Sequence, residues 1–188
     1  TIKPFLVNTE KGDSDSGLIS GSAVREGLEF RALKGTEKEA DFLKARAKAW
    51  KVDAQILVGK AATEIALSKV ESPDILHLAT HGFFLPANEQ DSKKPTYGLT
   101  NPMHRSGLAL AGAKRTLELW GEGKPPPPEN DGILTAAEAG LLNLDGTWLV
   151  TLSACETGKG DIVDGEGVMG LRRAFTQAGA QNLLMTLW

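Results

Sequence analysis

The 188-residue chain has a single cysteine, so it cannot form an internal disulfide bond, and one thiol fits a reducing compartment. Its 21 basic and 24 acidic residues nearly balance, without the basic cluster typical of proteins that bind nucleic acid or anionic membranes. Its apolar runs are far shorter than the roughly 20 residues of a membrane span. We therefore expect no direct binding of nucleic acid and no membrane partner.

The sequence also lacks a G-K-[ST] phosphate loop. A G-x-G-x-x-G pattern is present at residues 165–170, but it does not directly follow a predicted strand. The chain also ends before the acidic residue expected about 20 positions further on. The interpretation as a nucleotide-binding domain depends on this motif alone. We expect instead that the glycines let a loop turn into the helix that follows. We expect no cofactor.

Short apolar strands alternate with amphipathic helices along the chain. Two S/T-x-x-E patterns, Thr36–Glu39 and Thr135–Glu138, predict capping boxes at helix starts. The predicted helices are 36–50, 63–70, 135–142 and 166–178, and the predicted strands are 5–7, 55–58, 74–80, 107–112, 148–152 and 182–187. This alternation is typical of a single α/β domain with a mostly parallel sheet and helices on both faces.

Residues 83–130 interrupt the alternation and are mostly polar up to residue 106. Four consecutive prolines at 125–128 exclude a helix or a central strand there and favour an exposed polyproline segment. A surface loop is the simpler interpretation of this segment, and a peptide-binding role is the alternative. Because long irregular insertions beside active sites can act as lids, we treat 83–130 as a candidate lid.

Two predicted strands run out into polar residues at positions where a reactive pair can form. Strand 148–152 leads to Cys155, and strand 74–80 leads to His81 and Gly82. Ligands of open α/β sheets bind at the carboxyl ends of the strands, and neighbouring strands lie about 5 Å apart. We therefore predict a cysteine–histidine pair, in which the imidazole activates the thiol as a nucleophile. The backbone N–H groups of Gly82 and Cys155 are the candidate oxyanion donors.

Other interpretations of these residues stay open at this point. A free cysteine is commonly a small buried hydrophobe, and a single histidine is commonly a loop residue bonded to a carbonyl. His77 and His81 also have the H-x-x-x-H spacing that binds a metal ion on a helix. On a strand, four residues span roughly 13 Å, so we expect no metal site and interpret His77 as a packed strand residue.

Around these residues the chain resembles the CHAT family, caspase-like cysteine proteases from the clan of caspases, separases and gingipains. Members are often joined to tetratricopeptide repeats. The resemblance covers most of the chain from Gly35 onward, and residues 1–33 match weakly. The matching segments are ILHLATHGFF (75–84), SGLALAG (106–112), DGILTAAE (131–138), LSACETGKG (152–160), GEGVMGLRRAFTQAGA (165–180) and the closing LW.

The resemblance implies a caspase–hemoglobinase fold of three layers and a catalytic dyad, with Cys155 as the nucleophile and His81 as the general base and then acid. It places the oxyanion hole at the N–H groups of Gly82 and Cys155. It further implies a bacterial, cytoplasmic endopeptidase with one protein target, some members acting in antiphage defence. The expected regulator is a tetratricopeptide-repeat region, a CRISPR effector or another sensor.

The chain departs from the family pattern at its end. In the family, the LW strand runs into an acidic segment that shapes the substrate pocket, whereas this sequence stops at Trp188. We therefore expect a piece of a longer protein, with the fold incomplete at the C-terminus. Asp164 and Glu166 are the remaining candidates for lining the pocket. The alternative to a protease is a catalytically inactive caspase-like interaction module that binds partners through 83–130.

Overall fold

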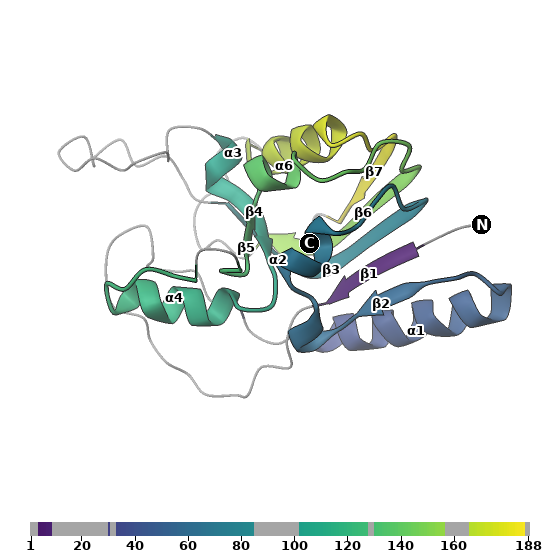
Figure 1. The fold of residues 1–188 in the computed structure, drawn as a ribbon, viewed down its shortest axis with the longest axis horizontal. Helices are drawn as coiled ribbons and strands as arrows, with labels where there is room; N and C mark the ends of the chain where they lie inside the picture. Colours follow the sequence, from purple (N-terminus) through teal and green to yellow (C-terminus); the bar gives the residue numbers. More distant parts are fainter. Residues whose placement is uncertain are drawn as a thin grey trace.

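The computed structural model describes residues 4–8, 30, 33–84, 102–127, 130–156 and 166–186. Strands and helices alternate through these residues, as the sequence predicts (Figure 1). The strands are β1 (Pro4–Asn8), β2 (Gln55–Leu57), β3 (Ile75–Phe84), β4 (Ser106–Ala109), β5 (Ile133–Thr135), β6 (Leu149–Glu156) and β7 (Asn182–Met185). The helices are α1 (Lys34–Trp50), α2 (Glu64–Ser68), α3 (Pro102–Arg105), α4 (Ala113–Gly121), α5 (Ala136–Ala139) and α6 (Glu166–Gln177), with a 3-10 turn η1 (Gly59–Ala61).

Five of the strands form a parallel sheet in the order β2–β1–β3–β6–β7. The central strand β3 pairs with β6 over residues 75–82 on one side. On its other side, β1 pairs with residues 75–79 and β4 pairs antiparallel with residues 81–84. Strand β5 then pairs antiparallel with β4. The predicted mostly parallel sheet is confirmed, and it carries an antiparallel extension at the carboxyl end of β3.

Helices cover both faces of this sheet, which gives the three layers that the sequence predicts. Alternate residues of a strand point to opposite faces, and the inner strands place their leucines and valine on the face of α2, α5 and α6. The main core on this face includes Leu67, Leu76, Leu78, Leu108, Leu144, Val150, Leu152, Leu171 and Phe175.

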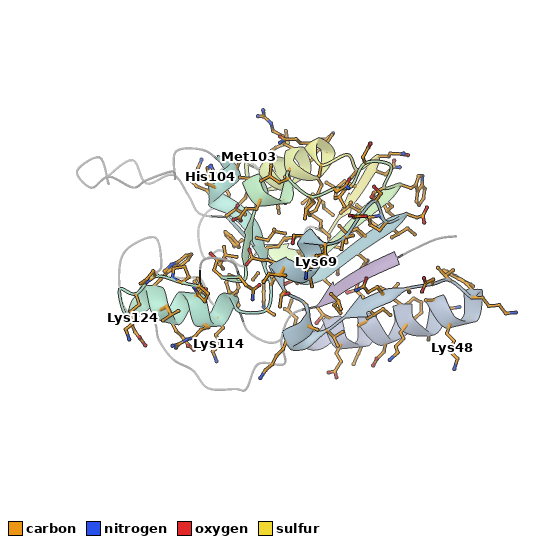
Figure 2. The ribbon with its side chains drawn as sticks, viewed as in Figure 1. Lys48, Lys69, Met103, His104, Lys114 and Lys124 are labelled. Carbon is orange, nitrogen blue, oxygen red and sulfur yellow. The ribbon has the colours of Figure 1, made fainter. Side chains whose placement is uncertain are left out.

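Helix α1 lies on the opposite face, where Glu39 contacts side chains of β3 and β6. Its buried side includes Thr36 and Ala40. Lys48 points away from the strands (Figure 2), as expected for the solvent side of an amphipathic helix.

One of the two predicted capping boxes is wrong. Helix α1 begins at Lys34 with Leu33 as its N-cap and no side-chain cap. The Thr36 hydroxyl donates to the Leu33 carbonyl at 2.7 Å instead of accepting a backbone N–H. The Glu39 carboxylate is held by the sheet, so it is not available to the helix N-terminus.

The second capping box is confirmed at α5. Thr135 Oγ1 accepts from the Glu138 N–H at 3.3 Å, and Glu138 Oε2 accepts from the Thr135 N–H at 2.8 Å. The helix ends at Ala139, earlier than predicted. The predicted stop of α6 is also confirmed, since Gly179 follows the helix with a φ of 107°. An added Cβ there would lie 2.7 Å from the Asp145 backbone, so this turn requires glycine.

The predicted ends of the two strands that lead to the reactive pair are wrong. Strand β3 continues to Phe84 and β6 continues to Glu156, so His81 and Cys155 lie within strands and not in loops. The reason is pairing: β6 and β4 flank β3 over residues 81 and 82, and the ladder keeps small and polar residues extended.

The described part of 83–130 is more regular than the sequence suggests. Residues 83 and 84 complete β3, and α3, β4 and α4 lie between residues 102 and 121. Residues 124–127 have no regular structure, as the prolines predict, and most of them are exposed. Residues 8–22 are rich in glycine, serine and aspartate and predict a loop; Asn8 instead ends β1, and the rest of this range lies outside the described residues.

Candidate active site

The pairing of β3 with β6 brings His81 and Cys155 together. In the parallel register of the two strands, the Cα of His81 is the direct partner of the Cα of Cys155. Partners on neighbouring strands stand on the same face of a sheet about 5 Å apart. The Cys155 side chain lies outside the described part of the structure, so the adjacency rests on the backbone alone.

His81 is nearly enclosed, with 5% of its surface exposed. The ring of Phe30 lies against its imidazole, with a centroid distance of 5.6 Å and a tilt of 39°. Phe30 also contacts the ring of Phe83 at 6.2 Å. No sequence motif marks Phe30, because it lies in the segment that matches the family weakly.

The antiparallel extension supports His81 from the side of β4. Ala109 is the register partner of His81, and its carbonyl accepts a hydrogen bond from the Thr80 hydroxyl. Ala109 is paired in turn with Ile133 of β5. One row of register partners therefore crosses the four strands β5, β4, β3 and β6, and it consists of Ile133, Ala109, His81 and Cys155.

Beyond β7, Thr186 fixes the backbone of β6 next to Cys155. Its hydroxyl accepts from the Ala154 N–H at 3.1 Å, and its own N–H donates to the Leu152 carbonyl at 3.0 Å. This contact extends the β6–β7 ladder up to the residue before the candidate nucleophile.

A second polar group lies on the same face as the pair. Glu39 Oε1 of α1 is 2.9 Å from His77 Nε2 of β3, and Glu39 Oε2 accepts a hydrogen bond from the Ser153 hydroxyl of β6 at 3.0 Å. Burial lowers the pKa of His77, and the nearby carboxylate opposes this effect. A neutral imidazole with a hydrogen on Nε2 fits this contact.

His77 thus lies largely buried in a strand, as the sequence predicts, and its Nε2 lies 2.9 Å from a carboxylate that the sequence pattern did not indicate. The sequence pattern predicts that Glu39 is part of a helix cap, and it carries no signal for Ser153. Their contact joins residues 114 positions apart, which no local pattern reports.

The candidate oxyanion donors both lie inside paired strands. Gly82 is the partner of Leu108 in β4 and of Glu156 in β6, and Cys155 is the partner of His81. Backbone N–H groups within a ladder are used for strand pairing. Binding of an oxyanion at these groups would require the last pairs of the ladder to open, and the role stays a prediction.

The candidate pocket residues are not tested by the structure. Asp164 lies outside the described residues, and Glu166 is the first residue of α6, with its side chain outside them as well. No group of three or more histidine, cysteine, aspartate or glutamate side chains that could hold a metal ion occurs in the described ranges.

A pair of partly buried carboxyl groups holds the turn that leads into β5. Glu64 Oε2 accepts from the Gly132 N–H at 2.7 Å, and Asp131 Oδ1 accepts from the Ile133 N–H at 2.7 Å. Burial raises the pKa of Glu64 to about 7, and it also raises the pKa of Asp131. Gly132 has a φ of 77°, and an added Cβ there would lie 2.1 Å from the backbone nitrogen of Ala113, so the turn fits only glycine.

A family model described as the CHAT domain matches residues 6–188, which is nearly the whole chain and includes both strands of the candidate site. None of the curated proteins compared with the chain matches it. Within the part of the chain that the structure describes, none of the helices has the length and apolar character needed to cross a membrane.

Proposed function

Because the chain belongs to the CHAT domain family, which is related to the caspase-like cysteine proteases, we propose that it is a cysteine endopeptidase with Cys155 as nucleophile and His81 as general base and acid. The observation that carries this proposal is the register of the sheet, in which His81 and Cys155 are direct partners. A thiol and an imidazole on the same face of neighbouring strands are within reach of a hydrogen bond.

The proposed reaction has two steps. The Cys155 thiolate attacks the carbonyl carbon of the scissile peptide, and the protonated imidazole of His81 gives its proton to the leaving amine. The product is a thioester between Cys155 and the carbonyl part of the substrate. His81 then takes a proton from water, the resulting hydroxide attacks the thioester, and the free acid and the thiolate are restored.

Control of this activity belongs to the same proposal. The family resemblance supports a protein substrate and a regulator that is an attached tetratricopeptide-repeat region, a CRISPR effector or another sensor. It likewise supports a role in bacterial antiphage defence in the cytoplasm. Asp164 and Glu166 are proposed for the substrate pocket as the remaining acidic candidates, since the family pattern places its acidic segment after the closing LW.

One observation favours the second candidate, an inactive interaction module. The imidazole of His81 is nearly enclosed, with Phe30 against it, and Gly82 is paired on both sides. A resting protease that opens on activation accounts for the same features, since catalytic contacts are often poorly formed without substrate. The two candidates differ in whether Cys155 reacts selectively.

Labelling with thiol-reactive peptide ketones tests the proposal, with the modified residue identified by mass spectrometry. We expect selective labelling at Cys155 that increases with pH, no labelling of Cys155→Ala, and a rate lower by roughly 100-fold or more in His81→Gln. His104→Gln is the matched control, because His104 is an exposed histidine on α3 (Figure 2). Equal labelling of His81→Gln and the unmodified protein would refute the dyad.

A further inference from the structure

Helix α1 reaches both strands of the dyad through one carboxylate. The two oxygens of Glu39 contact His77 on β3 and Ser153 on β6, at 2.9 and 3.0 Å. The side chain of His77 is only 13% exposed and that of Glu39 is 31% exposed, so the contact is partly shielded from water. It is therefore a better-defined contact than an exposed surface ion pair.

The register places this contact directly behind the dyad. On the face of α1, successive rows of the β3–β6 pair are His77 with Thr151, Ala79 with Ser153, and His81 with Cys155. Alternate residues share a face, and each such step covers roughly 6.6 Å. The carboxylate of Glu39 thus spans the two rows that precede the dyad row on the same face.

The start of α1 also leads to the imidazole. Leu33 caps the helix, and its carbonyl accepts from both the N–H and the hydroxyl of Thr36, at 3.1 and 2.7 Å. Phe30 lies just before this cap in the chain, and its ring is in contact with His81. The seating of α1 on the sheet therefore limits where the ring of Phe30 can lie.

We propose that Glu39 is a positioning residue for the dyad: by bridging β3 and β6 it seats α1 so that Phe30 packs against the imidazole of His81. Glu39 does not touch the reacting atoms and acts through His77, Ser153 and Phe30. This inference rests on the proposed function for its catalytic meaning, whereas the seating of the imidazole can be measured without any reaction.

The first experiment follows the imidazole of His81 by proton–carbon NMR, with the signals assigned from their loss in His81→Gln. An aromatic ring at this distance shifts the imidazole signals, and Phe30→Ala gives their values without it. We expect Glu39→Ala to move the signals toward the Phe30→Ala values and Ser153→Ala to move them part of the way. Signals of both variants that match the unmodified protein would overturn the proposal.

The second experiment measures the rate of Cys155 labelling by the same peptide ketone in these variants. We expect Glu39→Ala to slow labelling roughly tenfold through misplacement of the imidazole, with a smaller loss in Ser153→Ala. Glu39→Gln keeps an acceptor for Ser153 and a hydrogen-bonding partner for His77, so we expect it to restore the rate to within about twofold. A rate in Glu39→Gln as low as in Glu39→Ala would contradict positioning through these two polar contacts.

Two variants of α1 separate positioning from a general loss of stability or charge. Asp41→Ala removes an exposed carboxylate from the same helix, and Ala45→Gly weakens the helix at an exposed position. We expect both to leave the NMR signals and the labelling rate unchanged. A matching loss of labelling in Ala45→Gly would assign the effect of Glu39→Ala to helix stability and overturn the proposal.

The outcomes also distinguish this inference from the proposed function. If Cys155 shows no selective labelling in the unmodified protein, the protease proposal fails, and the NMR comparison still decides whether Glu39 positions the imidazole. If labelling depends on Cys155 and His81 while Glu39→Ala changes neither measurement, the protease proposal stands and the positioning role is wrong.

Discussion

Gly107 faces Phe83 across the antiparallel pair of β3 and β4. A Cβ at this position would lie 2.4 Å from the Leu134 carbonyl oxygen and 2.7 Å from the Phe83 ring. The carbonyl belongs to a paired strand and cannot move aside without breaking the ladder. Glycine is therefore what allows the Phe83 ring to lie against β4, where it contacts the ring of Phe30.

We expect Gly107→Ala to reduce the free energy of unfolding by about 2 kcal/mol, within the usual range for overpacking. Gly35→Ala is the matched control, because a Cβ there meets nothing within 4 Å inside α1. That substitution should stabilise the protein by about 0.5–1 kcal/mol. Urea denaturation measures both, and a loss of stability in Gly35→Ala equal to that of Gly107→Ala would contradict the steric argument.

The raised pKa of Glu64 makes stability depend on pH. The folded state holds this proton up to about pH 7, whereas the unfolded chain releases it near 4.5, so stability falls as the pH rises between these values. The difference corresponds to about 3 kcal/mol, and the half-exposed position of the carboxyl reduces this to about 1 kcal/mol.

Glu64→Gln removes this titration, and its free energy of unfolding should decline less between pH 5 and pH 8 than that of the unmodified protein. Denaturation curves at several pH values measure the slope. Glu122→Gln is the control, because Glu122 is fully exposed and its pKa is lowered by Lys124, which puts its titration below this range. An unchanged slope in Glu64→Gln would show that Glu64 does not titrate in this window.

Two short sequence patterns of the same type have different outcomes at α1 and α5. Both have threonine followed three residues later by glutamate, and the pattern caps α5 but not α1. At α1, the sheet offers Glu39 a histidine and a serine, and these long-range partners replace the local bond. The threonine–glutamate pattern thus predicts the presence of a helix in both places, but it does not predict which group the glutamate carboxylate contacts.

We expect Thr135→Ala to cost about 1 kcal/mol of stability, because α5 has a single turn and depends on its cap. Thr135→Ser retains the hydroxyl and should stay close to the unmodified protein. Thermal unfolding compares the two variants, and equal midpoints for Ala and Ser would remove the cap as a source of stability.

Most of the helices and strands are predictable because their apolar periods and stop signals are local, whereas α3, α4 and β5 are not predicted. The carboxyl ends of β3 and β6 are not predictable, because their small and polar residues are typical of loops. They are extended only because neighbouring strands pair with them. The adjacency of His81 and Cys155 followed from general rules for parallel sheets. The contacts of Phe30 with His81 and of Glu39 with His77 and Ser153 do not follow from such rules. They join segments that are far apart in the chain, and only tertiary packing brings these segments together.

Strand β3 lies at the centre of the described sheet, since it pairs with β6 on one side and with β1 and β4 on the other over most of its length. Strands β2 and β7 pair on one side only within the described sheet. We expect the amides of β3 to exchange with solvent most slowly and those of β2 and β7 much faster. Hydrogen–deuterium exchange with peptide-level mass spectrometry measures this, and exchange of β3 as fast as that of β7 would contradict the pairing scheme.

The pairing of β3 with β6 places a strict condition on changes of chain length. Inserting or deleting one residue within β6 ahead of Cys155 would carry this cysteine to the opposite layer, among the leucines beneath α2 and α6, with almost no change in composition. Inserting or deleting two residues would keep Cys155 on the same face as His81. It would also move the cysteine by one row along the strand, so that it no longer pairs with the histidine. The site therefore tolerates many exchanges of one amino acid for another more readily than a single added or lost codon in this strand.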